Sequence, residues 1–180
     1  MKDYSNEILD ALNNHTEEFC KYVNIKNKEY GYKDFTKKIK TIIGNLGEAK
    51  GFDVLCSGVD NIYGNDNKEF IYDLTWVDIE IKQDKFPIVK SVPLVLESEI
   101  SGKKWGQFKE DFDKLLLAKS SYKLMIFTKN NQKDFDLAIK YAGLAVESFS
   151  GFEANDFIDL IYFDESGEGD FKKETFTKKI

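Results

Sequence analysis

The chain has 180 residues and a formal net charge of −6 at pH 7, which disfavours indiscriminate binding of nucleic acid over its whole surface. This length suits one domain with a substantial core, and a hydrophobic content of 42% with only 2 prolines excludes a disordered chain and a repeat array. The sequence has neither an apolar run of membrane-spanning length nor a signal-peptide pattern, so we expect a cytoplasmic protein with no membrane attachment.

The N-terminal part of the chain predicts two helices with a loop between them. Apolar residues at helical spacing indicate a helix over Asp3–Val23, and the polar stretch Asn24–Lys33 is typical of a loop. Asp34 is a plausible N-cap of the second helix, which we expect to end at Gly51. A glycine inside this helix, Gly47, should weaken it, since glycine has a low helix propensity.

The rest of the chain alternates strands and helices. Short apolar runs predict strands at Phe52–Cys56, Phe70–Ile81, Val92–Ile100, Tyr122–Thr128 and Phe157–Phe163. Apolar residues at helical spacing predict helices at Trp105–Lys119 and Gln132–Val146. The tail from Phe171 to Ile180 could add an edge strand or stay mobile. This order predicts an α/β fold, with a mixed central β-sheet of about five strands flanked by helices on both faces.

Carboxylates stand out in two of the predicted strands. Glu97 and Glu99 end the run Val92–Ile100, and because side chains alternate along a strand, both should point to one face while Ser98 points to the other. Like charges on one face of a buried strand repel each other, so a cation should compensate them. Asp73, in the preceding strand, offers a third oxygen ligand. An all-oxygen set suits Mg²⁺ or Mn²⁺ and does not suit zinc.

Asp73 followed by Glu97 and Glu99 resembles the PD-(D/E)XK nuclease superfamily, in the E-x-E variant of some restriction enzymes. In that superfamily a helix supplies an early Glu, a β-hairpin supplies the Asp and the (D/E)-x-K pair, and a helix and a strand follow. This chain has the same order over roughly Ile39–Thr128, with Glu48 at the end of a helical segment. The chain departs from the pattern in two respects: no proline precedes Asp73, and Glu99 stands where the family usually has lysine.

The resemblance implies a restriction-endonuclease-like fold and a metal-dependent phosphodiesterase, similar to an endonuclease, that acts on DNA more readily than on RNA. Asp73 and Glu97 would hold Mg²⁺ or Mn²⁺, Glu99 would share the metal or orient the attacking water, and Glu48 would help from its helix. Lys114, in the following helix, is the first candidate to replace the missing lysine. Replacing Asp73 by alanine should abolish cleavage and leave the fold intact or more stable, because a carboxylate repulsion is removed.

The resemblance also divides the single domain, residues 1–180, into an N-terminal helical region and loop, a nuclease-like core and a tail, at 1–33, 34–164 and 165–180. All 26 basic residues are lysines, which bind phosphate but lack the fork that arginine uses for guanine. Drift away from arginine codons would give the same bias. Candidate lysines for contacts with the DNA backbone belong to the lysine-rich run from Lys33 to Lys40 or follow the carboxylate strand: Lys37, Lys38, Lys103 and Lys104.

Two alternatives stay open. A nuclease-like fold that has lost catalysis could serve as a binding or regulatory module, and activity could require a homodimer or a partner protein. A small acidic immunity or inhibitor protein would need no metal site, and its Asp73 and Glu97 side chains would diverge. For a nuclease, the carboxylates should instead converge at one end of the sheet, with Lys114 in hydrogen-bond reach and a lysine-lined cleft beside them.

Overall fold

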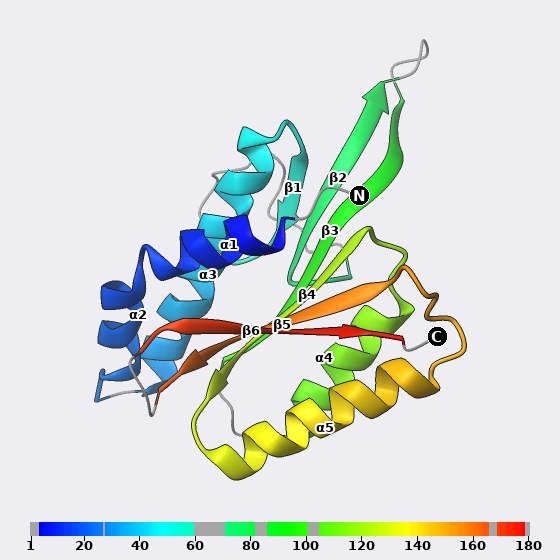
Figure 1. The fold of residues 1–180 in the computed structure, drawn as a ribbon. Coiled ribbons are helices and arrows are strands. Elements are labelled where there is room, and N and C mark those ends of the chain that lie inside the picture. The colour runs from blue at the N-terminus through cyan, green and yellow to red at the C-terminus, as the bar shows by residue number, and fades with distance from the viewer. Residues whose placement is uncertain are drawn as a thin grey trace.

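The computed structural model of the chain describes residues 4–26, 28–59, 71–81, 86–100, 105–165 and 169–178. These residues form a six-stranded mixed sheet with helices on both faces, which confirms the predicted α/β class (Figure 1). The helices are α1 (Ser5–Asn13), α2 (Thr16–Val23), α3 (Lys28–Ala49), α4 (Trp105–Leu117) and α5 (Gln132–Ser148). None of these described helices is long and apolar enough to cross a membrane.

The strand order in the sheet follows the order in the chain. The strands are β1 (Asp53–Cys56), β2 (Leu74–Ile81), β3 (Pro87–Glu99), β4 (Tyr122–Lys129), β5 (Phe157–Asp164) and β6 (Phe171–Thr177). β1, β2 and β3 are antiparallel neighbours, whereas β3, β4 and β5 run parallel and are joined through α4 and α5. The described sheet has six strands because the C-terminal segment pairs with β5 as an antiparallel edge strand, so the edge-strand alternative is the correct one.

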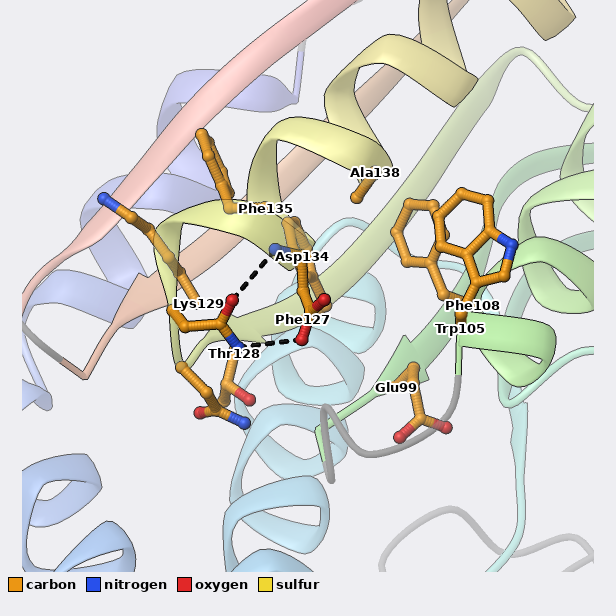
Figure 2. Close-up of a pocket in the computed structure, with 11 residues that line it drawn as sticks. Glu99, Trp105, Phe108, Phe127, Thr128, Lys129, Asp134, Phe135 and Ala138 are labelled. Carbon is orange, nitrogen blue, oxygen red and sulfur yellow. Dashed lines mark hydrogen bonds between the residues drawn. The ribbon is translucent and has the colours of Figure 1, made fainter.

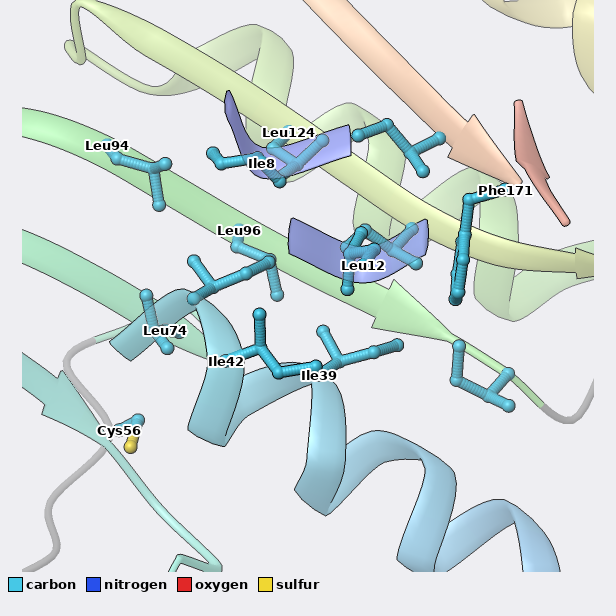
Figure 3. Close-up of a cluster of buried hydrophobic side chains, with 14 of the residues drawn as sticks. Ile8, Leu12, Ile39, Ile42, Cys56, Leu74, Leu94, Leu96, Leu124 and Phe171 are labelled. Atoms are coloured by element: carbon cyan, nitrogen blue, oxygen red, sulfur yellow. The ribbon is translucent and has the colours of Figure 1, made fainter. Parts of the chain in front are cut away.

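The sheet separates two hydrophobic cores. Leu94 and Leu96 of β3 pack in the core beneath α1, α2 and α3, and Val95 packs in the core beneath α4 and α5. Figure 3 shows the part of the first core that lies between β3, α1 and α3. Because side chains alternate along a strand, this arrangement continues into the carboxylate segment. Glu97 and Glu99 therefore belong to the α4 and α5 face, and the predicted alternation around Ser98 is confirmed.

Two predicted boundaries in the N-terminal part are wrong. The segment Asp3–Val23 is not one helix but α1 and α2, and the side-chain amide of Asn13 marks the break by exchanging hydrogen bonds with the backbone of Phe171 in β6. α3 begins at Lys28 rather than after Asp34, because a buried tyrosine extends its apolar face by one turn. The end of α3 is confirmed, since Gly51 follows it with a φ of 82°.

Candidate active site

The sequence predicted Asp73 inside a strand, but this residue lies just before β2, which begins at Leu74. The preceding Ile71 has a φ of 71°, in the left-handed region that β-branched residues rarely adopt. Tyr72 packs against the core of α4 and α5, whereas Leu74 packs against the opposite core. Regular alternation would place these two side chains on the same face. Because the backbone is irregular here, the Asp73 side chain does not follow the alternation of side chains between the two faces along β2.

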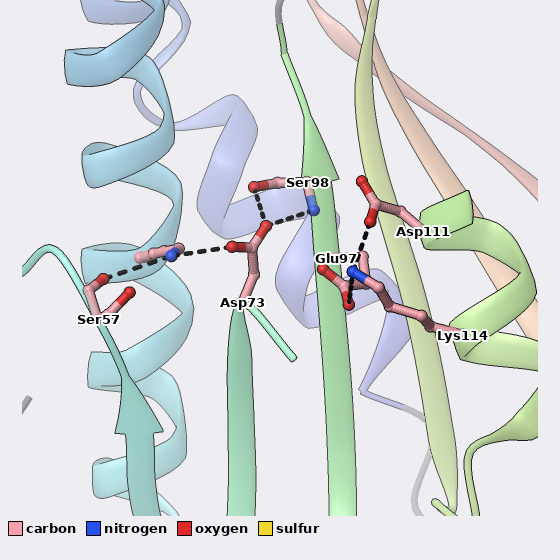
Figure 4. Close-up of polar contacts among 7 residues, drawn as sticks. Ser57, Asp73, Glu97, Ser98, Asp111 and Lys114 are labelled. Atoms are coloured by element: carbon pink, nitrogen blue, oxygen red, sulfur yellow. Dashed lines mark hydrogen bonds and ion pairs between the residues drawn. The ribbon is translucent and has the colours of Figure 1, made fainter. Parts of the chain in front are cut away.

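The Asp73 carboxylate is held on the side of the sheet that α3 covers. Its Oδ2 accepts hydrogen bonds from the backbone N–H and the hydroxyl of Ser98, each at 2.8 Å, and its Oδ1 lies 3.1 Å from the ammonium of Lys40 (Figure 4). The Lys40 side chain is only 7% exposed and also donates to the carbonyl oxygen of Ser57. A cation that compensates Asp73 is thus supplied by the protein itself, from α3.

Glu97 is directed to the other side of the sheet, toward α4. Its carboxylate is 5% exposed, and its Oε1 lies 3.4 Å from the ammonium of Lys114, which also donates to Asp111 at 2.8 Å. The predicted contact between Lys114 and the carboxylate strand is confirmed. The ion pair lacks the alignment of a hydrogen bond, so Oε1 of Glu97 is a buried acceptor without a hydrogen-bond partner among the described residues.

The surroundings of Glu97 shift its acid–base equilibrium. Burial, together with the negative charge of Asp73, raises the pKa of Glu97 from 4.5 to about 7, although Lys114 opposes the shift. Burial lowers the pKa of Lys114, but the hydrogen bond to Asp111 and the charge of Glu97 outweigh that effect and raise it above its ordinary value. Glu97 therefore gains a proton near neutral pH unless a cation approaches it more closely than Lys114 does.

This shift predicts a pH-dependent stability that Glu97→Gln removes. In metal-free buffer, the free energy of unfolding of the unaltered protein, relative to that of the variant, should fall by roughly 2–3 kcal/mol as the pH rises from about 4.5 to about 7. In this interval the unfolded chain ionises Glu97 while the folded protein keeps it protonated, so proton release favours unfolding. Urea unfolding at a series of pH values measures the difference. A constant difference would mean that folded Glu97 is ionised throughout.

Glu99 lies at the end of β3, where two hollows meet. One is a groove of about 680 Å³ that runs along the N-terminal half of α3. Its charged lining residues are three lysines and three carboxylates: Lys33, Lys37, Lys40, Glu29, Asp34 and Glu99. The groove opens along the lysine run from Lys33 to Lys40, where a cleft was expected, but of the three predicted carboxylates Glu99 alone is among the residues that line it. The other is a cavity of about 200 Å³ on the α4 and α5 face.

Several predicted residues lie away from this end of the sheet. Glu48 is exposed in the last turn of α3, eight residues beyond Lys40 and thus about 12 Å further along the helix axis. Lys38 forms an ion pair with Glu18 of α2 at 2.8 Å and is not among the residues that line the groove. The two remaining candidates for DNA contacts, Lys103 and Lys104, fall outside the residues that the structure describes.

The carboxylates meet only part of the requirement for a metal site. Asp73 and Glu97 diverge, as the inhibitor alternative predicts, and no group of three or more His, Cys, Asp and Glu is placed to hold a metal within the described part of the chain. Mg²⁺, however, is often bound through one or two carboxylates together with waters and substrate phosphates. Glu97 offers such a site one buried acceptor that has no hydrogen-bond partner among the described residues. Asp73 points to the other face of the sheet, and both of its oxygens already contact Lys40 or Ser98. The expected convergence of the two carboxylates is therefore not found, and they do not form a metal site in this arrangement.

No protein-family model, no curated protein and no solved structure matches this chain. These comparisons thus assign the chain to no family, and the resemblance to the PD-(D/E)XK superfamily depends on the residues and their arrangement alone. Among these, the order of a helix, three antiparallel strands, a helix and a parallel strand agrees with the order that the resemblance implies.

Proposed function

We propose that this protein is a Mg²⁺-dependent phosphodiesterase that cleaves DNA, with RNA a less suitable substrate. The observation that carries this proposal is the groove, because its lysines lead directly to the carboxylate end of β3. Lys33, Lys37 and Lys40 follow one another on one face of α3 over about 10 Å. This length corresponds to about three nucleotides of one DNA strand, and lysine suits contacts with phosphates better than the reading of base pairs.

Each group of the site has a part in this reaction. If Asp73 left Lys40 and turned toward Glu97, the two carboxylates would hold the metal, which would supply positive charge near the phosphate and lower the pKa of a water. The attacking water gives a proton to solvent as its oxygen bonds to phosphorus and one phosphate ester bond breaks. The leaving oxygen takes a proton from solvent. Lys114 favours the ionised form of Glu97, and Lys40 can exchange its ammonium between Asp73 and a phosphate.

Loss of the groove lysines should weaken the binding of DNA. The double variant Lys33→Ala/Lys37→Ala should lower the affinity for a short DNA duplex about tenfold at moderate salt, and should reduce the slope of log K against log salt concentration by about 2. Lys38→Ala is the control, since it removes one lysine from the same helix at a position outside the groove residues. Fluorescence anisotropy at several salt concentrations measures both values. Equal affinities for all three proteins would contradict the assignment of the groove.

A second candidate function is favoured by the contacts of Asp73. Both of its carboxylate oxygens already interact with Lys40 or Ser98, which suits a nuclease-like module that binds DNA without cleaving it. Calorimetric titration with Mn²⁺ separates the two functions. Binding that disappears in Glu97→Ala supports the enzyme, whereas no binding to the unaltered protein supports the inactive module.

A further inference from the structure

The cavity on the other side of Glu99 has aromatic walls (Figure 2). It lies between α4 and the N-terminal part of α5, beyond the ends of β3 and β4. Its volume of about 200 Å³ is below the roughly 300–1,000 Å³ of pockets that hold drug-sized ligands. A cavity of this size admits one planar ring system and leaves no room for a second.

Two stacked aromatic pairs line this cavity and contact each other, since the ring centroids of Phe108 and Phe127 lie 5.4 Å apart. Trp105 stacks on Phe108 with ring centroids 5.8 Å apart, and Phe127 stacks on Phe135 at 6.1 Å with only 8° between the ring planes. Ala138 lies between the two pairs, where its small side chain leaves the depth of the cavity open (Figure 2). Trp105 is 40% exposed, so one aromatic face is available to a ring that enters from solvent.

A carboxylate decides which ring would be preferred. Glu99 borders the cavity and, when ionised, accepts hydrogen bonds but donates none. Guanine presents two adjacent donors, N1–H and the N2 amino group, on its Watson–Crick edge, whereas thymine presents a single N–H. A carboxylate can accept both guanine donors at once, in the bidentate manner that makes such contacts selective.

We propose that this cavity binds one unstacked nucleobase, preferentially guanine, from the strand whose phosphates lie in the lysine groove. The inference rests on the proposed function in one respect: Glu99 borders both the groove and the cavity, so one strand can occupy both. Proteins that bind single-stranded or extruded nucleotides hold the base by stacking on aromatic side chains and by hydrogen bonds to its Watson–Crick edge. The cavity offers both kinds of contact.

The two tryptophans of the chain make the test direct. Trp76 is fully buried in the opposite core, so a change in intrinsic fluorescence on addition of a nucleotide reports Trp105. Titration with dGMP in metal-free buffer should give a saturable change, with an affinity about tenfold higher than for dTMP. Ala138→Leu fills the cavity and should weaken dGMP binding about tenfold or more. Lys140→Leu adds the same side chain to an exposed position of α5 and should leave binding unchanged.

Additional variants and ligands distinguish the possible outcomes of this binding test. If Ala138→Leu proves unfolded by circular dichroism, Glu99→Gln replaces it and should remove the preference for guanine. Equal binding of dGMP and dTMP, or equal dGMP binding by Ala138→Leu and Lys140→Leu, would overturn the inference. If the base belongs to a DNA strand that also occupies the groove, Lys33→Ala/Lys37→Ala should weaken the binding of a guanine-containing oligonucleotide but not that of dGMP. Unchanged binding of the oligonucleotide would show that the base does not come from a strand held in the groove. Saturable dGMP binding without any DNA cleavage would overturn the phosphodiesterase and leave the base site standing.

Discussion

Asp73→Ala is expected to abolish Mg²⁺-dependent cleavage of DNA and to lower the free energy of unfolding by about 2–4 kcal/mol. Removal of this carboxylate leaves the buried ammonium of Lys40 without the partner that lies 3.1 Å away, and the N–H and hydroxyl of Ser98 lose their acceptor. The loss of one partner from a buried ion pair is strongly destabilising, and the partial exposure of Asp73 reduces the effect somewhat. The expectation from sequence that this variant would be at least as stable as the unaltered protein is therefore reversed.

The double variant Lys40→Met/Asp73→Ala separates stability from chemistry. It removes both charges and fills the space of Lys40 with an apolar side chain, so it should recover most of the lost stability. It should still fail to cleave DNA, because the carboxylate remains absent. Urea unfolding and the conversion of supercoiled plasmid DNA in the presence of Mg²⁺ give the two readouts. Cleavage by Asp73→Ala at the unaltered rate would refute the role of Asp73 in the reaction.

The parts of the site that follow from local periodicity could be predicted from the sequence. Alternation along β3 places Glu97 and Glu99 on one face and Ser98 on the other, as expected from three consecutive residues alone. The contact of Lys114 with Glu97 follows from the same kind of reasoning. A helix that connects two parallel strands must pack back over the sheet, so a lysine near its apolar face lies close to the strand before it.

Lys40 was not predicted from the sequence as a residue of the site, although its position in α3 indicates a buried charge. It lies between Ile39 and Ile43 on the buried face of α3 and is 5% exposed, and a lysine at such a position requires a counterion. That the counterion is Asp73 could not be predicted. The pairing depends on the irregular backbone at Ile71 and on the way α3 crosses the sheet, and neither leaves a periodic pattern in the sequence.

The cavity beside Glu99 could not be predicted for a related reason. Trp105, Phe127 and Ala138 come from α4, β4 and α5, and each has the spacing of an ordinary core residue. Periodicity assigns such residues to the interior but does not reveal where their packing leaves a space. The volume depends on how three elements that are distant in sequence come together, which only the tertiary structure specifies.

Gly47 also has a different structural role from the one expected. The sequence predicted that this glycine would weaken the second helix. In the folded protein α3 crosses β2 at this residue, and a Cβ atom on Gly47 would lie 2.4 Å from Nε1 of Trp76. The indole cannot retreat, because it is fully buried, donates from Nε1 to the carbonyl oxygen of Ile43 and packs against the ring of Phe52. Glycine is thus what allows α3 to approach the sheet.

Gly47→Ala is therefore expected to lower the free energy of unfolding by about 3 kcal/mol, although alanine favours a helix by about 1 kcal/mol over glycine. The added methyl group must push α3 away from β2, which opens the core around Trp76. Since α3 also carries Lys37 and Lys40, the same displacement should reduce DNA binding in the groove. Urea unfolding measures the stability, and fluorescence anisotropy measures the binding.

Gly106→Ala provides the matched control, because it makes the same substitution in a helix where no atom lies within 4 Å of the added Cβ. This variant should gain about 0.5 kcal/mol, since helix propensity acts there without a steric cost. The two glycine variants should thus change stability in opposite directions. If Gly47→Ala were instead as stable as Gly106→Ala, the close approach of α3 to Trp76 would not exist in solution, and the position of the groove lysines relative to Asp73 would have to be revised.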